Sequence, residues 1–246
     1  MTMPPARLLD LTRLVSRLGR GALTGVDRVE LAYLQALLAG PVPLFGLVRT
    51  AAGFVLLDRR GAQGVADLAT GARATGRADL LGRLTRRGQP DRARAEAAVR
   101  RLALARVPRP LLGWMLRRHL PGGVSYLNVG HANLTRAVMR AVQSLPGARV
   151  AVLVHDAIPL GYPQFTRAGI SAVFGRKLAV VSAEADLVIY STQDARARAE
   201  VHLARLGRVP PAVVAALGVP QPVPDAAALP PGLNLRGPWF VTVGTI

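Results

Sequence analysis

The sequence predicts an α/β protein with a doubly wound, mostly parallel sheet. From residue 124 onward, short apolar stretches alternate regularly with stretches of helical pattern. The apolar stretches are hydrophobic at successive positions, which is typical of parallel strands that helices cover on both faces. In addition, 50% of the 246 residues are hydrophobic, so the chain can bury a large core.

Residues 6–15, "ARLLDLTRLV", are expected to form the first strand, followed by a glycine-rich loop at residues 17–25. A helix should come next, because Thr24 and Asp27 have the spacing of a capping box at a helix start. Apolar side chains then recur on one helical face and predict its buried side: Val26, Val29, Tyr33 and Leu37.

Residues 42–50 and 53–58 are expected to form two strands joined by a tight Ala-Ala-Gly connection. Residues 61–118 are rich in Arg and Ala and have a helical pattern, which is clearest over residues 91–106. This stretch contains no recognisable motif.

The second half of the chain supplies the alternation on which the fold prediction depends. Strands are expected at residues 124–129, 148–154, 186–190 and 212–217, and helices around residues 136–144, 167–184 and 195–206. Residues 1–219 thus form one predicted domain. Residues 220–238 are too rich in proline for regular structure and are expected to be a linker, and residues 239–246, "WFVTVGTI", have the pattern of one more buried strand.

Composition excludes several classes of site. The chain has no cysteine, so disulfides, thiol catalysis and Cys-based metal sites are absent. Its net charge of +18 favours an anionic partner, although the near-exclusive use of arginine is equally consistent with a compositional bias. Nucleic acid is an unfavoured partner, because aromatic residues are only 4% of the chain and are not interleaved with the arginines. No apolar run reaches the ~20 residues that span a bilayer.

Polar side chains follow three of the predicted strands, at the edge where doubly wound sheets bind ligands. The first group is His131 and Asn133, after Gly130; the second is His155 and Asp156; the third begins at Ser191. These residues are the candidate site.

The pair His155 and Asp156 is the strongest catalytic candidate. An imidazole and a carboxylate at one strand end could bind sugar hydroxyls or exchange a proton with an acceptor. The alternative is that Asp156 caps the next turn and His155 is only packed. His131 could likewise only satisfy turn backbone, and Ser191 has capping-box spacing to Asp194.

The glycine-rich loop, with Gly19, Gly21 and Gly25, could present backbone N–H groups to a phosphate or let a bulky ligand approach. Arg28 nearby could pair with a phosphate, or it could be a solvated surface charge. The spacing matches neither GxGxxG nor the Walker pattern, so a flexible turn remains an equal alternative.

Hydrolase and metalloenzyme motifs are missing. The sequence contains no GxSxG, no HExxH and no paired carboxylates at a shared position. The four histidines have no metal-ligand spacing, so no metal site and no bound cofactor are expected.

Several segments together resemble a known family. They are "DLTRLVSRLGRGALTGVDRVELAY", "YLNVGHANL", "HDAIPLGYPQF", "ADLVIYSTQDAR" and "VVAALGVP". The chain resembles the N-terminal, acceptor-side half of a glycosyltransferase of the family 4 / group 1 type, which has the GT-B fold with Rossmann-like domains. "WFVTVGTI" resembles the first strand of the second domain of that family, and residues 51–121 match poorly.

The resemblance implies a two-domain enzyme that transfers a sugar from a nucleotide sugar to a glycan or glycolipid acceptor. In such enzymes the second domain holds the donor, usually without a metal, and many members retain the anomeric configuration. His155 matches the histidine near the transferred sugar and Asp156 its acidic neighbour. Gly25 matches the loop facing the cleft, and Asp27 and Arg28 follow it in the motif. Because the donor domain is not encoded within these residues, we expect the chain alone to be inactive.

An alternative from another class is a stand-alone basic module that binds anionic lipid or a protein partner. Arginine-rich helices between residues 83 and 118 could lie on an anionic membrane surface, or they could be solvated helix faces. The expected location is the cytoplasm, with peripheral contact at the inner face of the membrane.

Overall fold

A computed structural model describes residues 3–218 of the chain. The predicted linker at residues 220–238 and the predicted strand at residues 239–246 lie outside the described residues. The described residues therefore belong to the first predicted domain.

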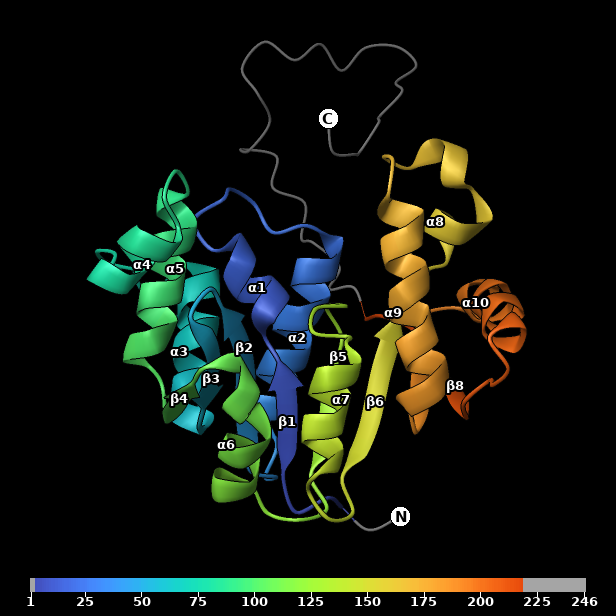
Figure 1. Cartoon of the computed structure of the whole chain (residues 1–246), viewed down its shortest axis with the longest axis horizontal. Helices are drawn as coiled ribbons and strands as arrows, with labels where there is room; N and C mark the ends of the chain where they lie inside the picture. Colours follow the sequence, from blue (N-terminus) through green and yellow to red (C-terminus); the bar gives the residue numbers. More distant parts are fainter. Residues whose placement is uncertain (1–2, 219–246) are drawn as a thin grey trace, which may run out of the picture.

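The described residues form one eight-stranded sheet in the order β4-β3-β2-β1-β5-β6-β7-β8 (Figure 1). Its strands are β1 (Arg7–Asp10), β2 (Leu44–Thr50), β3 (Gly53–Leu57), β4 (Ala105–Val107), β5 (Ser125–Asn128), β6 (Arg149–Val154), β7 (Leu187–Tyr190) and β8 (Ala212–Val214). Neighbouring strands are parallel except for the pairs β2-β3 and β3-β4. The predicted α/β class with a mostly parallel sheet is confirmed.

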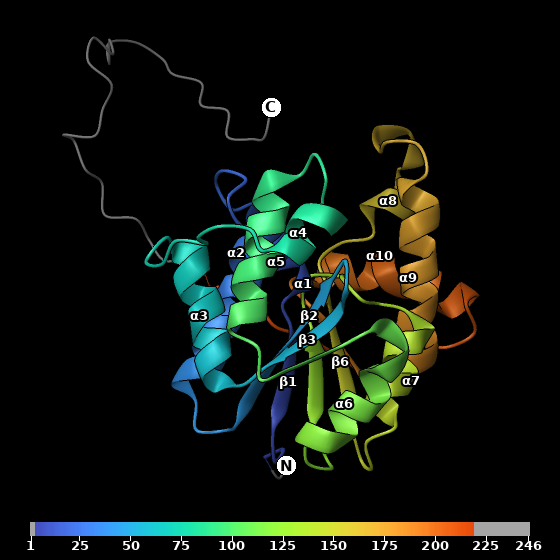
Figure 2. The ribbon, with the colours of Figure 1, turned by 60° about the vertical axis from the view of Figure 1, so that its left-hand side comes forward.

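Helices cover both faces of the sheet. They are α1 (Thr12–Arg17), α2 (Gly25–Ala39), α3 (Arg59–Thr70), α4 (Leu80–Thr85), α5 (Pro90–Arg101), α6 (Leu112–His119), α7 (Arg136–Gln143), α8 (Ile158–Gly161), α9 (Ile170–Glu184) and α10 (Gln193–Arg205), with short 3-10 turns at Arg109–Leu111 and Pro163–Phe165. Figure 2 shows α6 and α7 side by side on one face of the sheet. In the same view α3 and α5 lie to the left of this pair.

Each face of the sheet packs against its helices in a separate hydrophobic core. Leu8 of β1 belongs to the cluster that α6, α7, α9 and α10 cover, and its neighbour Leu9 belongs to the cluster under α1, α2, α3 and α5. Successive side chains of a strand point to opposite faces, so a strand buried on both must be apolar at every position. This explains the unbroken apolar stretches in the sequence.

The sheet has a switch point between β1 and β5. The chain leaves β1 for β2 on one side and later returns to β5 on the other side of β1. Connections that leave in opposite directions open a crevice at the carboxyl ends of the two strands, where α/β proteins bind ligands. The loops after β1, β5 and β6 therefore lie where a ligand site is expected.

The prediction of one strand over residues 6–15 is wrong in its second half. The strand ends at Asp10, and α1 begins at Thr12. Oδ1 of Asp10 accepts a hydrogen bond of 3.0 Å from the backbone N–H of Thr12. Side chains from the end of the strand into α1 are buried at helical spacing: Leu11, Leu14, Val15 and Leu18. The apolar run thus joined two elements of different period.

Helix α2 is confirmed, but its buried face was wrongly predicted. The buried residues are Asp27, Glu30 and Leu34, whereas Tyr33 and Leu37 are only half-buried. The predicted face instead lines an apolar hollow of 710 Å³, next to the segment of residues 215–218. Two carboxylates on the inner face reversed the apparent amphipathic pattern.

Two smaller predictions also need correction. Residues 105–107, predicted as helix, form the edge strand β4 beside β3, and three residues are too few to show a period. The N-cap of α10 is Thr192 rather than Ser191, because Thr192 Oγ1 accepts a 3.0 Å hydrogen bond from the Ala195 N–H.

Candidate functional site

A buried polar network lies at the carboxyl ends of β1 and β5. Oδ2 of Asp10 accepts hydrogen bonds from the Tyr126 hydroxyl at 2.9 Å and from Nδ2 of Asn133 at 2.6 Å. The same Nδ2 lies 2.7 Å from Oγ1 of Thr12, and Nδ2 of Asn128 donates to the Tyr126 hydroxyl at 3.0 Å. The network ties the loop after β5 to the end of β1.

Asp10, at the centre of the network, has an environment that shifts the pKa of its carboxyl toward neutral pH. Burial raises the pKa of Asp10 to about 6, against the opposing effect of its hydrogen bonds from Asn133, Thr12 and Tyr126. Its charge therefore changes in the range in which histidines usually titrate.

Glu30 is a second buried carboxyl beside the network, and the sequence analysis missed it. It is fully buried on α2, and within the described residues neither carboxyl oxygen has a hydrogen-bond partner. Burial, together with the nearby charge of Asp10, raises the pKa of Glu30 well above its usual value. The protonated form of Glu30 is thus favoured by its surroundings, and a Glu on a helical face looks in sequence like a surface residue.

Gly130 is the residue that lets the loop after β5 pass Glu30. A β-carbon at this position would collide with Oε2 of Glu30 and would lie 2.9 Å from the β-carbon of Arg13. Glycine is required at this position because the side chains of Glu30 and Arg13 approach the backbone closely, and not because of the backbone dihedral angles.

The two candidate residues after Gly130 have an unusual backbone. His131 and Asn133 both have φ of 55°, in the left-handed region that few non-glycine residues occupy. Such conformations persist only where surrounding contacts hold them, and they concentrate at functional sites. Here the buried Asn133 holds the loop through its bonds to Asp10 and Thr12.

The structure brings His131 and His155 together from the ends of β5 and β6. Their ring centroids lie 5.1 Å apart in an edge-to-face arrangement. Nε2 of His131 lies 2.7 Å from the carbonyl oxygen of Leu153, and Nε2 of His155 lies 2.7 Å from that of Val129. Because a carbonyl can only accept, each Nε2 carries its proton, and in the neutral ring Nδ1 carries the free lone pair.

Both imidazoles are neutral at physiological pH. Burial lowers the pKa of His131 to about 3, with a further contribution from His155, and burial also lowers the pKa of His155. The pair can therefore accept hydrogen bonds at its free ring nitrogens but does not act as a pair of cations.

Asp156 has a local structural task. Its Oδ1 accepts a 3.0 Å hydrogen bond from the N–H of Ile158, which is the turn-capping role considered as the alternative. Ser191 directly follows β7, further along the same edge. The structure thus places the ring of His155 against that of His131, while the carboxylate of Asp156 caps the following turn.

The glycine-loop candidates divide between two environments. Asp27 is buried, accepts from the Thr24 N–H at 2.9 Å, and pairs with Arg13 at 2.8 Å and with Arg17 at 3.3 Å. Gly25 begins α2 with open space beside it, and both Gly25 and the exposed Arg28 line the apolar hollow along that helix.

Asp27 connects the glycine loop to the histidine loop. Its partner Arg13 lies directly beside Gly130, so the segment that starts α2 is held against the loop that carries His131. The candidate residues His131, Asn133 and His155 therefore lie together at the carboxyl ends of β5 and β6, whereas Gly25 and Arg28 both line the hollow along α2.

Residues 3–218 contain no group of three acidic or histidine side chains that could hold a metal ion. None of the helices in this range is both long enough and apolar enough to cross a membrane. No protein family, curated protein sequence or solved structure matches this chain.

Proposed function

We propose that this chain is the acceptor-side domain of a glycosyltransferase that moves a sugar from a nucleotide-sugar donor to a glycan or glycolipid acceptor. The observation that carries the proposal is the pairing of His131 and His155, 5.1 Å apart and neutral, at the carboxyl edge beside the switch point. The segments that contain them are also those of the family resemblance.

The proposed chemistry uses the free lone pairs of the two rings. Nδ1 of a neutral imidazole can accept a hydrogen bond from a sugar hydroxyl, and the bonds from Nε2 to the Val129 and Leu153 carbonyls fix both rings in place. Fixed acceptors orient a sugar without an entropic cost at the moment of reaction. In this proposal His155 orients the transferred sugar and His131 supports it from the neighbouring loop.

In this proposal a second domain binds the donor, and the transfer retains the anomeric configuration and uses no metal. Transfer needs both substrates held in line in a closed cleft. We therefore expect the 246 residues alone to transfer no sugar.

The test uses the longest reading frame that contains these residues. Purified protein is incubated with radiolabelled UDP- and GDP-sugars and a lipid and glycan extract of its own cells, and label in the product is counted. We expect the longer protein to transfer sugar. The His155→Ala variant should lower the transfer rate about a hundredfold, and the His202→Ala variant, which changes a histidine of α10, should leave it nearly unchanged.

Other outcomes would contradict the proposal in distinct ways. Transfer by the 246 residues alone would exclude the two-domain arrangement. Equal activity of the His155→Ala and His202→Ala variants would remove His155 from the site, and a longer protein without any transfer would remove the glycosyltransferase assignment.

A stand-alone basic module is the second candidate. A hollow of 490 Å³ over α4 and α5 is lined by several arginines, including Arg77, Arg83 and Arg87. This surface could contact an anionic membrane at the cytoplasmic side. Sedimentation with anionic and neutral vesicles tests it: binding to anionic vesicles that disappears in an Arg83→Gln, Arg87→Gln variant would favour the module.

A further inference from the structure

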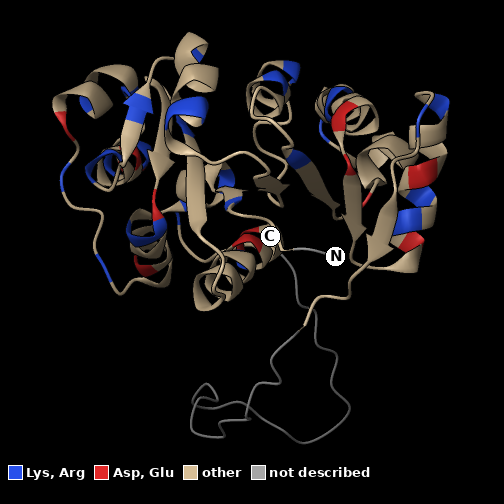
Figure 3. Cartoon of the chain, turned by 90° about the horizontal axis from the view of Figure 1, so that it is seen from below, with Lys and Arg blue, Asp and Glu red and all other residues tan. Residues whose placement is uncertain are grey.

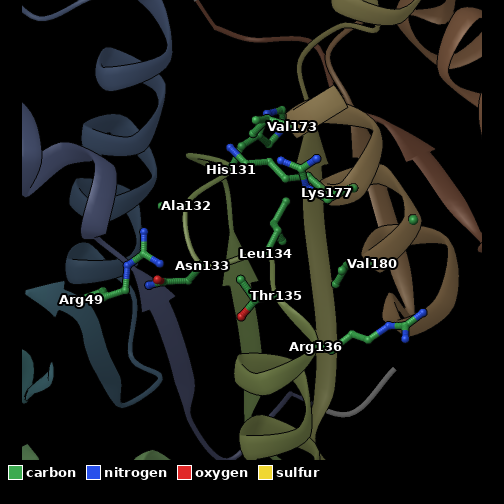
Figure 4. A pocket seen from close by; sticks show the side chains of 12 residues that line it. Arg49, His131, Ala132, Asn133, Leu134, Thr135, Arg136, Val173, Lys177 and Val180 are labelled. Atoms are coloured by element: carbon green, nitrogen blue, oxygen red, sulfur yellow. The ribbon is translucent and has the colours of Figure 1, made fainter. Parts of the chain in front are cut away.

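A basic hollow lies directly beside His131. It has a volume of 520 Å³ and runs between the loop after β5, the start of α7 and the side of α9 (Figure 4). Four cationic side chains line it, and no carboxylate does: Arg49, Arg136, Arg176 and Lys177.

These cations come from three separate elements of the fold. Arg49 is on β2, Arg136 begins α7, and Arg176 and Lys177 are on α9. Figure 4 shows Arg49 and Lys177 on opposite sides of the hollow. Because residues distant in sequence converge here, the arrangement is a product of the fold and not of one arginine-rich segment.

The four cations have no acidic partner among residues 3–218, whereas the ion pairs of that range lie elsewhere. Basic residues are spread over the helices on both sides of the sheet (Figure 3), and nine arginines among residues 3–218 form ion pairs with an Asp or Glu. At this hollow the positive charges are uncompensated and repel one another.

Lys177 is the only lysine of the chain and is partly buried in the wall of the hollow. Burial and the charges of Arg13 and Arg49 lower the pKa of Lys177. An anion in the hollow would relieve both effects, since it would replace lost hydration and offset the repulsion.

The backbone adds a further positive contribution. Thr135 is the N-cap of α7 and lines the hollow together with Arg136, the first residue of that helix. A helix start presents unpaired N–H groups and the positive end of the helix dipole. The N-terminus of α7 and the cations therefore favour the same sign of ligand charge.

A second hollow of 460 Å³ continues the first. The two share Arg49 and Thr135, and the second adds Arg109 and Arg140, again with no carboxylate. Leu134, Val173 and Val180 in the first hollow supply apolar wall next to the charges. A ligand that combines a phosphate with an apolar part fits this lining better than a uniformly charged polymer.

We propose that this hollow binds the phosphate or diphosphate group of the acceptor, so that the acceptor is a phosphorylated lipid or sugar whose free end reaches His131. The identification of the ligand as the acceptor rests on the proposed function, whereas the binding of an anion in the hollow does not. Arg49 and Lys177 hold the phosphate from opposite sides, and the start of α7 lies beneath it.

Calorimetric titration of the 246-residue chain tests the proposal with three probes: inorganic pyrophosphate, farnesyl diphosphate and UDP. We expect all three to bind, with farnesyl diphosphate tightest. The double variant Arg49→Gln, Lys177→Gln should lower the affinity for farnesyl diphosphate by about tenfold or more, because two charged hydrogen bonds to the diphosphate are lost.

The matched control is Arg60→Gln, Arg205→Gln, which removes the same charge from two exposed arginines outside the hollow. Its affinity should stay within about twofold of the wild type. Equal weakening in both variants, with both folded by circular dichroism, would show attraction by net charge alone and would overturn the site. Absence of binding by the wild type would also overturn it.

The probes separate the source of the phosphate. Tighter binding of UDP than of farnesyl diphosphate would assign the hollow to the donor and overturn the acceptor assignment. Anion binding at the hollow without sugar transfer by the longer protein would contradict the proposed function alone, and transfer without binding at the hollow would contradict this inference alone.

Discussion

Gly130 lies between Glu30 and Arg13 with no room for a β-carbon. We expect Gly130→Ala to lower the free energy of unfolding by about 2–4 kcal/mol, because the methyl group forces apart a buried carboxyl and the loop that carries His131. Gly25→Ala is the control, since no atom lies within 4 Å of a β-carbon there. Urea denaturation measures both, and a loss in Gly130→Ala no larger than in Gly25→Ala would show that the loop adjusts freely.

His131 makes stability depend on pH. The pKa of its ring is about 3 in the folded chain and 6.5 unfolded, so the unfolded chain binds the extra proton between these values and stability falls as pH falls. Relative to His131→Asn, the wild type should lose about 2–3 kcal/mol between pH 7 and pH 4. Asn is chosen because it tolerates the left-handed φ of this position.

Chemical denaturation at several pH values checks this linkage. The raised pKa of Asp10 acts in the opposite direction between its unfolded value of 3.8 and about 6, but it is present in both proteins and cancels in the difference. A difference between wild type and variant that does not change with pH would mean that His131 titrates normally in the folded state.

At the scale of elements, Glu96 of α5 holds α4, α5 and the β2-β3 turn together. It is 3% exposed, pairs with Arg86 at 2.5 Å and lies 3.7 Å from Arg92 and from Arg100, and it accepts a 3.0 Å hydrogen bond from the Ala51 N–H. Three arginines of the stretch expected to be solvated or membrane-bound, Arg86, Arg92 and Arg100, thus surround a buried carboxylate within the fold.

Neutralising Glu96 should be costly. We expect Glu96→Gln to destabilise the protein by about 3 kcal/mol, since it leaves the buried Arg100 with less compensation. Glu200→Gln removes the half-buried pair of Arg196 and Glu200 on α10, which lies closer to solvent than Glu96, and should cost less than about 1 kcal/mol. Thermal unfolding compares them, and similar melting temperatures would contradict the structural role of Glu96.

At the scale of the whole molecule, the net charge of +18 opposes compaction by self-repulsion. Raising NaCl from about 20 mM to about 300 mM should increase the melting temperature, because the Debye length then falls below the distance between most charges. A variant with Arg60, Arg118 and Arg205 changed to Gln should show a smaller increase. A melting temperature that falls with salt would instead mean that attractive pairs dominate.

The elements of the fold were predictable wherever one period governed a whole segment. Strands β6 to β8 are apolar on successive residues, and their alternation with α7, α9 and α10 was recognised. Prediction failed where two elements share one apolar run, at Asp10, and where a helix turns carboxylates inward, at Glu30. Both failures concern residues whose buried state depends on tertiary partners.

The candidate site was predictable in part for the same reason. His131, Asn133 and His155 were found because strand ends of a parallel sheet share one edge, but Asp10, Glu30 and the four cations of the hollow carry no local signal. An arginine in a chain with so many arginines is uninformative until its neighbours are known.

The sequence by itself determined the α/β class, the order of most elements and the edge at which polar groups gather, because periodicity and strand-end position are local properties of the chain. Only the tertiary structure decided that His131 and His155 meet, that Asp10 and Glu30 are buried, and that Arg49 faces Lys177 across a hollow. These depend on strand order, since β2, β1, β5 and β6 bring together loops that lie far apart along the chain.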